Sequence, residues 1–214
     1  MIRVPGNGVA NLTRAMLKQS LSLVPIRRDL YQAKLVFYLF IASLSMFFIA
    51  SLMTYYLVRV QSFRPIEQSY ESLAIPWSFW ASSGLLLLVS LFLQRASWMV
   101  HRERQVEFRR WLLWGWATAI VFIFIQAIGL QELLTHHFTQ SDGSTKIYGM
   151  SFTLSLIHVL HVAGGIIFLG YIIHQAFRNR YDHERHWAVD HCAGYWHFLD
   201  VVWIMMLALF MITG

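Results

Sequence analysis

The stretch from Tyr195 to Trp203 reads Tyr-Trp-His-Phe-Leu-Asp-Val-Val-Trp, and it opens an apolar run that continues to the end of the sequence. A run of this length is long enough to cross a bilayer as a helix. His197 and Asp200, three residues apart, are its strongly polar side chains. Helical spacing places them on one face with the indoles of Trp196 and Trp203. Because a carboxylate inside a bilayer costs roughly 2.5–3.5 kcal/mol on insertion scales, we expect Asp200 to face protein and not lipid.

Composition indicates a membrane protein. The chain has 214 residues, of which 57% are hydrophobic and 13% charged, whereas soluble domains have about 25% charged residues. We predict an all-α bundle of five transmembrane helices at about residues 35–58, 76–93, 111–134, 150–174 and 193–213, after a basic segment at residues 1–34. The first apolar block is too long for a cleaved signal core. The single cysteine, Cys192, excludes an internal disulfide and a cysteine-rich metal site.

The basic residues alternate between the two sides of this predicted bundle. Fourteen of the seventeen lysines and arginines lie in residues 1–34, 94–110 and 175–191. Since cytoplasmic segments carry the excess of positive charge, the N-terminus is predicted to be cytoplasmic and the C-terminus to lie outside. The net charge of +6 is thus explained by topology, and nucleic acid is not an expected partner.

Three polar residues of other predicted spans stand out, namely Gln126, His158 and His161. Single buried polar groups in membrane bundles more often join helices than carry out chemistry, and we interpret Gln126 as structural. Histidines also bind haem and metals, but helical rise places His158 and His197 roughly 10 Å apart in depth. Haem ligation between them is therefore not expected. His161 and Asp200 come to similar depth, so we predict that this carboxylate bonds His161, with His158 second.

Other histidines fall near the predicted membrane surfaces, where solvation is the simplest expectation: His136, His137, His183, His186 and His191. The segment that holds Arg185, His186 and Asp190 is a candidate contact with a partner subunit.

Four segments resemble one protein family in the right order. The stretch from Tyr195 to Trp203 resembles the signature of the last helix of subunit III of haem-copper terminal oxidases. The stretch Phe152-Thr-Leu-Ser-Leu-Ile-His-Val-Leu-His-Val-Ala-Gly-Gly165 resembles the penultimate helix. Leu39-Phe-Ile-Ala-Ser-Leu-Ser-Met-Phe-Phe48 and Ile75-Pro-Trp77 resemble two earlier helices. Together the resemblance covers nearly everything from residue 35 onward.

Three departures from the family pattern follow from the same comparison. Longer members have seven helices, and this chain resembles the short bacterial form that lacks the first two, so their lipid-filled cleft is incomplete here or completed by another chain. Many members carry a carbodiimide-reactive glutamate where this sequence has Leu44. The glutamate that often follows the position of Gln126 by three residues is Gly129 here, with Glu132 one turn later.

The resemblance implies a supporting subunit of the bacterial inner membrane. Such a subunit holds no haem or copper, which belong to partner subunits; it packs on subunit I beside other oxidase subunits, binds phospholipid and sustains proton uptake. No catalytic, cofactor-binding or metal residue is expected in this chain. Two alternatives remain open: an accessory or maturation protein of the same fold associated with nitric oxide reductase, and a small haem-binding or transport protein.

Overall fold

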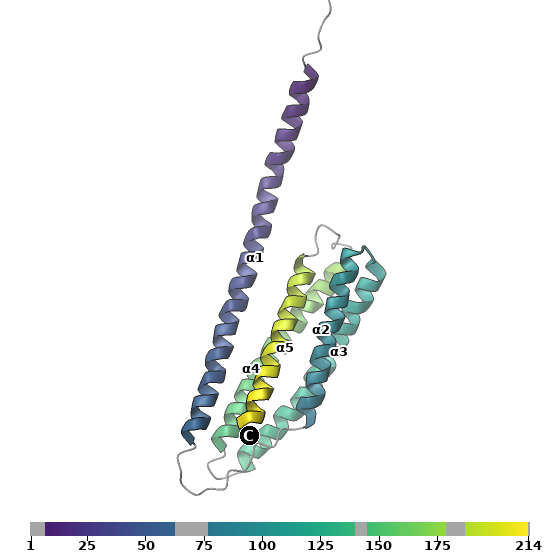
Figure 1. Cartoon of the computed structure of the whole chain (residues 1–214). Coiled ribbons are helices and arrows are strands. Elements are labelled where there is room, and N and C mark those ends of the chain that lie inside the picture. Colours follow the sequence, from purple (N-terminus) through teal and green to yellow (C-terminus); the bar gives the residue numbers. More distant parts are fainter. Residues whose placement is uncertain (1–6, 63–76, 140–144, 179–186, 214) are drawn as a thin grey trace, which may run out of the picture. The chain divides into compact units, whose positions relative to one another are not determined.

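The structure is a computed structural model that describes residues 7–62, 77–139, 145–178 and 187–213. Every regular element in these ranges is a helix: α1 (Asn7–Ser62), α2 (Trp77–His101), α3 (Gln105–Thr139), α4 (Thr145–Phe177) and α5 (Trp187–Thr213) (Figure 1). Each of the five contains a segment long and apolar enough to cross a membrane. The predicted five-helix all-α membrane fold is therefore confirmed.

The chain divides into two units, Met1–Ser45 and Met46–Gly214, and α1 crosses their boundary. The first unit is built on the N-terminal part of α1, so helix extends through most of the basic segment at residues 1–34. The second unit holds the end of α1 and the other four helices. It contains every site considered below.

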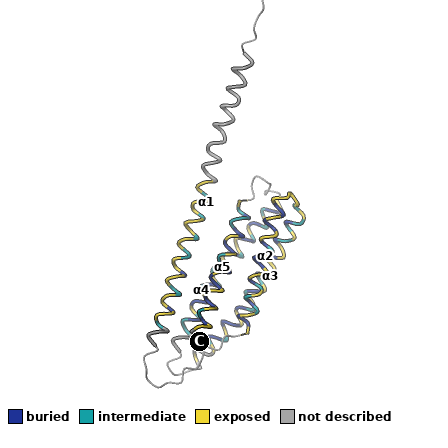
Figure 2. Tube along the Cα trace, in the orientation of Figure 1, coloured by how far each residue is buried: buried dark blue, intermediate teal, exposed yellow. Residues whose placement is uncertain are grey.

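In the second unit α2, α3, α4 and α5 form a ring of packed helices. α2 packs on α3 and α5, and α4 packs on the same two helices (Figure 1). Their inner faces are buried, as the dark segments of Figure 2 show. On α2 the buried side chains recur every three or four residues, which is the spacing of one helix face.

The end of α1 that belongs to this unit also packs inward at two points. The ring of Phe48 lies 5.2 Å from that of His161 on α4, and the ring of Tyr55 lies 5.3 Å from that of Phe210 on α5. Tyr55 also accepts a hydrogen bond from the Ser151 hydroxyl at 3.4 Å. Two aromatic side chains thus join this segment to α4 and α5.

A tight reversal connects α2 to α3. Glu103 has a φ of 59°, in the left-handed region that side chains other than glycine seldom adopt. The amide of Arg104 donates to the carbonyl of Met99 at 3.1 Å, which closes the turn. The ends of two long helices are thereby held together.

Candidate functional site

The stretch from Tyr195 to Trp203 lies in the middle of α5 and supplies much of its buried face. The indoles of Trp196 and Trp203 are 0% and 1% exposed, and Asp200 is 6% exposed. His197 lies on the outer side of the helix. The face predicted to carry both polar groups is therefore divided, with the carboxylate inside and the imidazole at the edge.

Trp203 joins three helices. Its Nε1–H donates a hydrogen bond to Ser83 Oγ on α2 at 2.8 Å. Its indole stacks on the imidazole of His158 on α4, with ring centroids 5.1 Å apart, and meets the ring of Phe79 edge-on at 5.2 Å. A buried indole whose N–H is satisfied and whose faces are covered fixes the mutual positions of the elements around it.

The pair Gly164–Gly165 on α4 serves the neighbouring α5. A Cβ at Gly165 would lie 3.0 Å from the ring of Tyr195 and 3.4 Å from that of Trp196, whereas a Cβ at Gly164 would meet nothing within 4 Å. Tyr195 also donates its hydroxyl hydrogen to the carbonyl oxygen of His161 at 2.9 Å. Only Gly165 is thus needed for close approach of the two helices, as small residues commonly are in membrane bundles.

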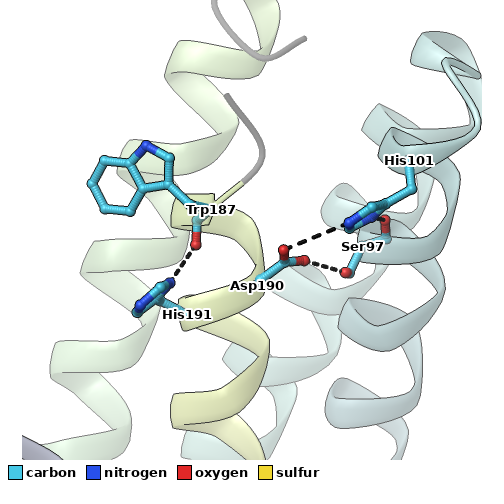
Figure 3. Close-up of polar contacts among 5 residues, drawn as sticks. All are labelled: Ser97, His101, Trp187, Asp190 and His191. Carbon is cyan, nitrogen blue, oxygen red and sulfur yellow. Dashed lines mark hydrogen bonds and ion pairs between the residues drawn. The ribbon is translucent and has the colours of Figure 1, made fainter. Parts of the chain in front are cut away.

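At the end of the α2–α5 interface, Asp190 links the two helices (Figure 3). Ser97 donates its hydroxyl hydrogen to Asp190 Oδ1 at 2.5 Å, and His101 Nε2 lies 3.7 Å from Asp190 Oδ2. His101 Nδ1 lies 2.6 Å from the carbonyl oxygen of Ser97, so this nitrogen must carry the hydrogen. On α5, next to Asp190, His191 Nδ1 donates to the carbonyl of Trp187 at 2.6 Å. Sequence reasoning named Asp190 as a subunit contact and missed Ser97 and His101.

Further polar contacts continue along the same interface. His197 Nε2 lies 3.1 Å from Gln94 Oε1, at the outer edge of the two helices. We call the row of polar side chains along this interface the α2–α5 polar seam, and its members are Ser83, Ser90, Gln94, Ser97 and His101 on α2, with Asp190, His197, Asp200 and Trp203 on α5. Three cross-helix contacts between side chains belong to the seam, namely Ser97–Asp190, Gln94–His197 and Ser83–Trp203.

The predicted pairing of Asp200 with a histidine of α4 is wrong. Asp200 Oδ2 lies 4.0 Å from Nδ1 of His197 on its own helix, and Oδ1 has no hydrogen-bond partner. The Ser90 hydroxyl on α2 lies near the carboxyl, but it has no well-formed hydrogen bond. His161 instead directs Nδ1 to the carbonyl of Ile157 at 2.7 Å. The cause is rotation of α5 about its axis, which turns Asp200 toward α2.

Gln126 and His158 are completely buried. Both are 0% exposed, and neither the amide of Gln126 nor either ring nitrogen of His158 has a hydrogen-bond partner. The described residues contain no group of three histidine, cysteine, aspartate or glutamate side chains placed to hold a metal ion. The loop residues His183, Arg185 and His186, and the side chains of His136 and His137, lie outside what the structure describes.

An open, mainly apolar groove of about 730 Å³ lies between α1, α3 and α4. Its walls include Ser51 and Val58 of α1, Leu134 of α3, and Met150 and Ile157 of α4. The Ser51 hydroxyl donates to the carbonyl of Phe47, so this wall offers little unused polarity. The groove has the chemistry to take an apolar chain.

Comparison with known proteins assigns the chain to a family. The family model of cytochrome c oxidase subunit III matches residues 28–214, which include all the packed helices and the α2–α5 polar seam. The chain belongs to this family. It is a multi-pass membrane protein of the subunit III type.

Relatives named cytochrome c oxidase subunit 3 agree with the family match. The chain is 32% identical over 90 residues to the protein of Formosania lacustris and 36% identical over 86 residues to that of Tetraodon nigroviridis. These matches cover 42% and 40% of this chain but only 33% and 31% of the relatives. A match to the Spodoptera frugiperda protein, 32% identical over 90 residues, covers 42% of this chain and 59% of that relative. The matched part thus spans about a third of the first two relatives.

Proposed function

We propose that this subunit III is a non-catalytic part of a proton-translocating haem-copper oxidase in the inner membrane of a bacterium. It packs on subunit I beside other oxidase subunits, binds phospholipid and supports proton uptake during the reduction of oxygen to water. Haem and copper reside in the partner subunits. Membership of the subunit III family carries the proposal.

An apolar outer face on α2 supports the contact with subunit I. Trp80, Leu87 and Leu91 are 54%, 46% and 59% exposed, and helical spacing places them on one side. Gly84 lies between them, and a Cβ there would meet nothing within 4 Å. A flat strip around a glycine lets a neighbouring helix approach closely. We place subunit I against this strip and against the outer face of α1, where Met46 is 74% exposed.

The groove between α1, α3 and α4 supports phospholipid binding. Its volume of about 730 Å³ and its apolar walls suit an acyl chain. In a membrane the natural occupant of an open apolar groove is lipid, because no polar groups there require water.

Co-purification tests the proposal. Affinity purification of the tagged chain in mild detergent, followed by mass spectrometry and a visible spectrum, is expected to recover one haem- and copper-containing partner subunit per copy of this chain. Gly84→Leu should reduce this recovery several-fold by blocking the α2 strip. Gly164→Leu is the matched control, because this glycine on α4 is equally open but lies away from the strip. Recovery of the chain without a haem-copper partner contradicts the proposal.

Depletion tests the role in proton uptake. An oxidase purified without this chain is expected to start at a normal rate and to lose activity during sustained turnover. Adding the chain back should restore the lifetime. Equal stability of the depleted and complete enzymes over many turnovers contradicts this part of the proposal.

A further inference from the structure

The core of the ring formed by α2, α3, α4 and α5 contains a group of buried polar side chains that the proposed function does not use. Gln126 on α3 and Ser155 and His158 on α4 are all 0% exposed. The amide nitrogen and oxygen of Gln126, the Ser155 hydroxyl oxygen and both ring nitrogens of His158 lack hydrogen-bond partners. We call these three residues the inner polar cluster.

The packing of α4 on α5 fixes the level of two members. The ring of His158 stacks on Trp203, 5.1 Å away between centroids. Ser155 precedes His158 by three residues and therefore lies on the same face of α4, one turn away. Both lie on the buried stripe of this helix.

The packing of α3 brings Gln126 to the same level. A Cβ at Gly129 would fall 2.5 Å from Ser78 Oγ and 2.6 Å from the ring of Phe79, which itself packs on Trp203. Gln126 precedes Gly129 by three residues on the same face.

Contacts with α4 give the same level independently. A Cβ at Gly170 on α4 would lie 3.7 Å from Trp116 Nε1 on α3. The two helices are neighbours in the ring and run antiparallel, so Gln126 lies at the level of Leu160 along the bundle axis. This level is within one helical turn of His158, which is about 5.4 Å along the axis.

The Ser155 hydroxyl, like those of Ser78 and Ser90, is buried without a hydrogen-bond partner. Several other helical hydroxyls bond the carbonyl three or four residues earlier, as Ser82 does to Phe79 at 3.0 Å and Thr118 does to Trp114 at 2.8 Å. Ser155 makes no such bond. A hydroxyl that makes no hydrogen bond to a carbonyl of its own helix is available to bond a group across the core.

We propose that the inner polar cluster is an internal binding site for ordered water. Buried polar groups are almost always hydrogen-bonded to protein or to ordered water, and an unpartnered one is strongly disfavoured. Gln126 offers two donors and an acceptor, neutral His158 one of each, and Ser155 a rotatable hydroxyl. Water, which both donates and accepts, complements this set, whereas an anion or a cation would be left with groups of the wrong sign. Bridged by water, the three residues join α3 to α4 inside the membrane.

X-ray radiolytic footprinting of the wild-type chain in lipid nanodiscs tests for the water directly, because hydroxyl radicals formed from bound water oxidise the side chains beside it. Trp203 is the reporter, since it is 1% exposed and adjoins His158. We expect it to be oxidised several-fold faster in the wild-type chain than in the double variant Gln126→Leu, His158→Phe. Equal, slow oxidation of Trp203 in the two proteins overturns the proposal.

Substitutions give a second, independent readout. Gln126→Leu and His158→Phe are each expected to lower the thermal midpoint, because each leaves the remaining groups without their shared water. The double variant should lose less than the two single losses combined. If the core were dry, each substitution would remove an unsatisfied polar group, and the thermal midpoint would rise or stay the same. The effects of the two substitutions would also add. These results would overturn the proposal. Ser155→Ala, which removes one oxygen, gives the same comparison if a larger change prevents folding.

Discussion

At the scale of single residues, Asp200 shows what helical arithmetic can and cannot give. The contacts of His158 with Trp203 and of Gly165 with Trp196 make α4 and α5 antiparallel with His161 level with Asp200, as the sequence predicted. Depth follows from the rise per residue alone. The direction of a side chain also depends on how the helix is rotated about its axis, and this rotation is set by the space available for the indoles of Trp196 and Trp203. That space is formed by the neighbouring helices, so the sequence of α5 alone does not predict it.

The surroundings of Asp200 predict a small effect of replacing its charge. Its contact with His197 is long, at 4.0 Å; the Asp200 side chain is only 8% exposed, but that of His197 is 46% exposed and open to screening by solvent. A contact this long with an exposed partner contributes about 0–1 kcal/mol. Asp200→Asn, which keeps the shape, should therefore change the free energy of unfolding by no more than about 1 kcal/mol, measured by denaturant titration in detergent. A much larger loss would mean that the carboxylate has a closer partner, and His161→Phe would show whether that partner lies on α4.

At the scale of elements, close packing of α3 on α2 depends on Gly129. This is the position where the family often carries a glutamate, and here Ser78 and Phe79 fill the space that a side chain would need. The departure from the family pattern thus falls at a position where α2 leaves no room for a side chain. Glu132, one turn later, is only half-buried.

Gly129→Ala is predicted to destabilise the chain. The new Cβ would lie 2.5 Å from Ser78 Oγ and 2.6–2.8 Å from the ring of Phe79, so the helices must move apart. Overpacking of this kind costs about 1–3 kcal/mol, against a gain in helix propensity of about 1 kcal/mol. The matched control is Gly84→Ala on the open face of α2, which should be neutral or stabilising. Thermal unfolding followed by tryptophan fluorescence measures both, and equal behaviour of the two variants would contradict the close packing.

The helix ends show why sequence reasoning found the five elements but not their full length. Long apolar runs identify a membrane helix with little ambiguity, and all five were predicted. The second span was expected to end near residue 93, yet α2 continues to His101, and α5 begins at Trp187, before the expected residue 193. The added turns hold Ser97, His101 and Asp190, which hydropathy assigns to a loop. They remain helical because their polar groups bond one another across the interface.

The buried polar residues were only partly predictable for the same reason. Gln126 and His158 stand out in the sequence as polar residues within apolar runs, whereas the importance of Ser83 and Gly165 emerges only from their contacts with Trp203 and Tyr195. A serine or glycine in a membrane span carries no distinguishing pattern by itself. Its role depends on which large side chain of another helix lies opposite.

At the scale of the whole molecule, orientation in the membrane stays a prediction, and charge and helix order make it specific. An odd number of spans places the two termini on opposite sides. The reversal between α2 and α3 carries Arg102 and Arg104, and the segments expected on its side of the membrane hold fourteen of the seventeen basic residues. The positive-inside tendency therefore places this reversal and the N-terminus in the cytoplasm and the connection between α3 and α4 outside.

Cysteine labelling in sealed vesicles of known orientation tests this topology. The background is low because the single native cysteine, Cys192, is fully buried. A membrane-impermeant maleimide should label Ser144→Cys only from the outside and Arg102→Cys only from the cytoplasmic side. Opening the vesicles with detergent should make both positions reactive, which controls for local shielding. If both cysteines react from the same side, an even number of crossings separates them, and α3, which lies between the two positions, does not span the membrane as the charge pattern requires.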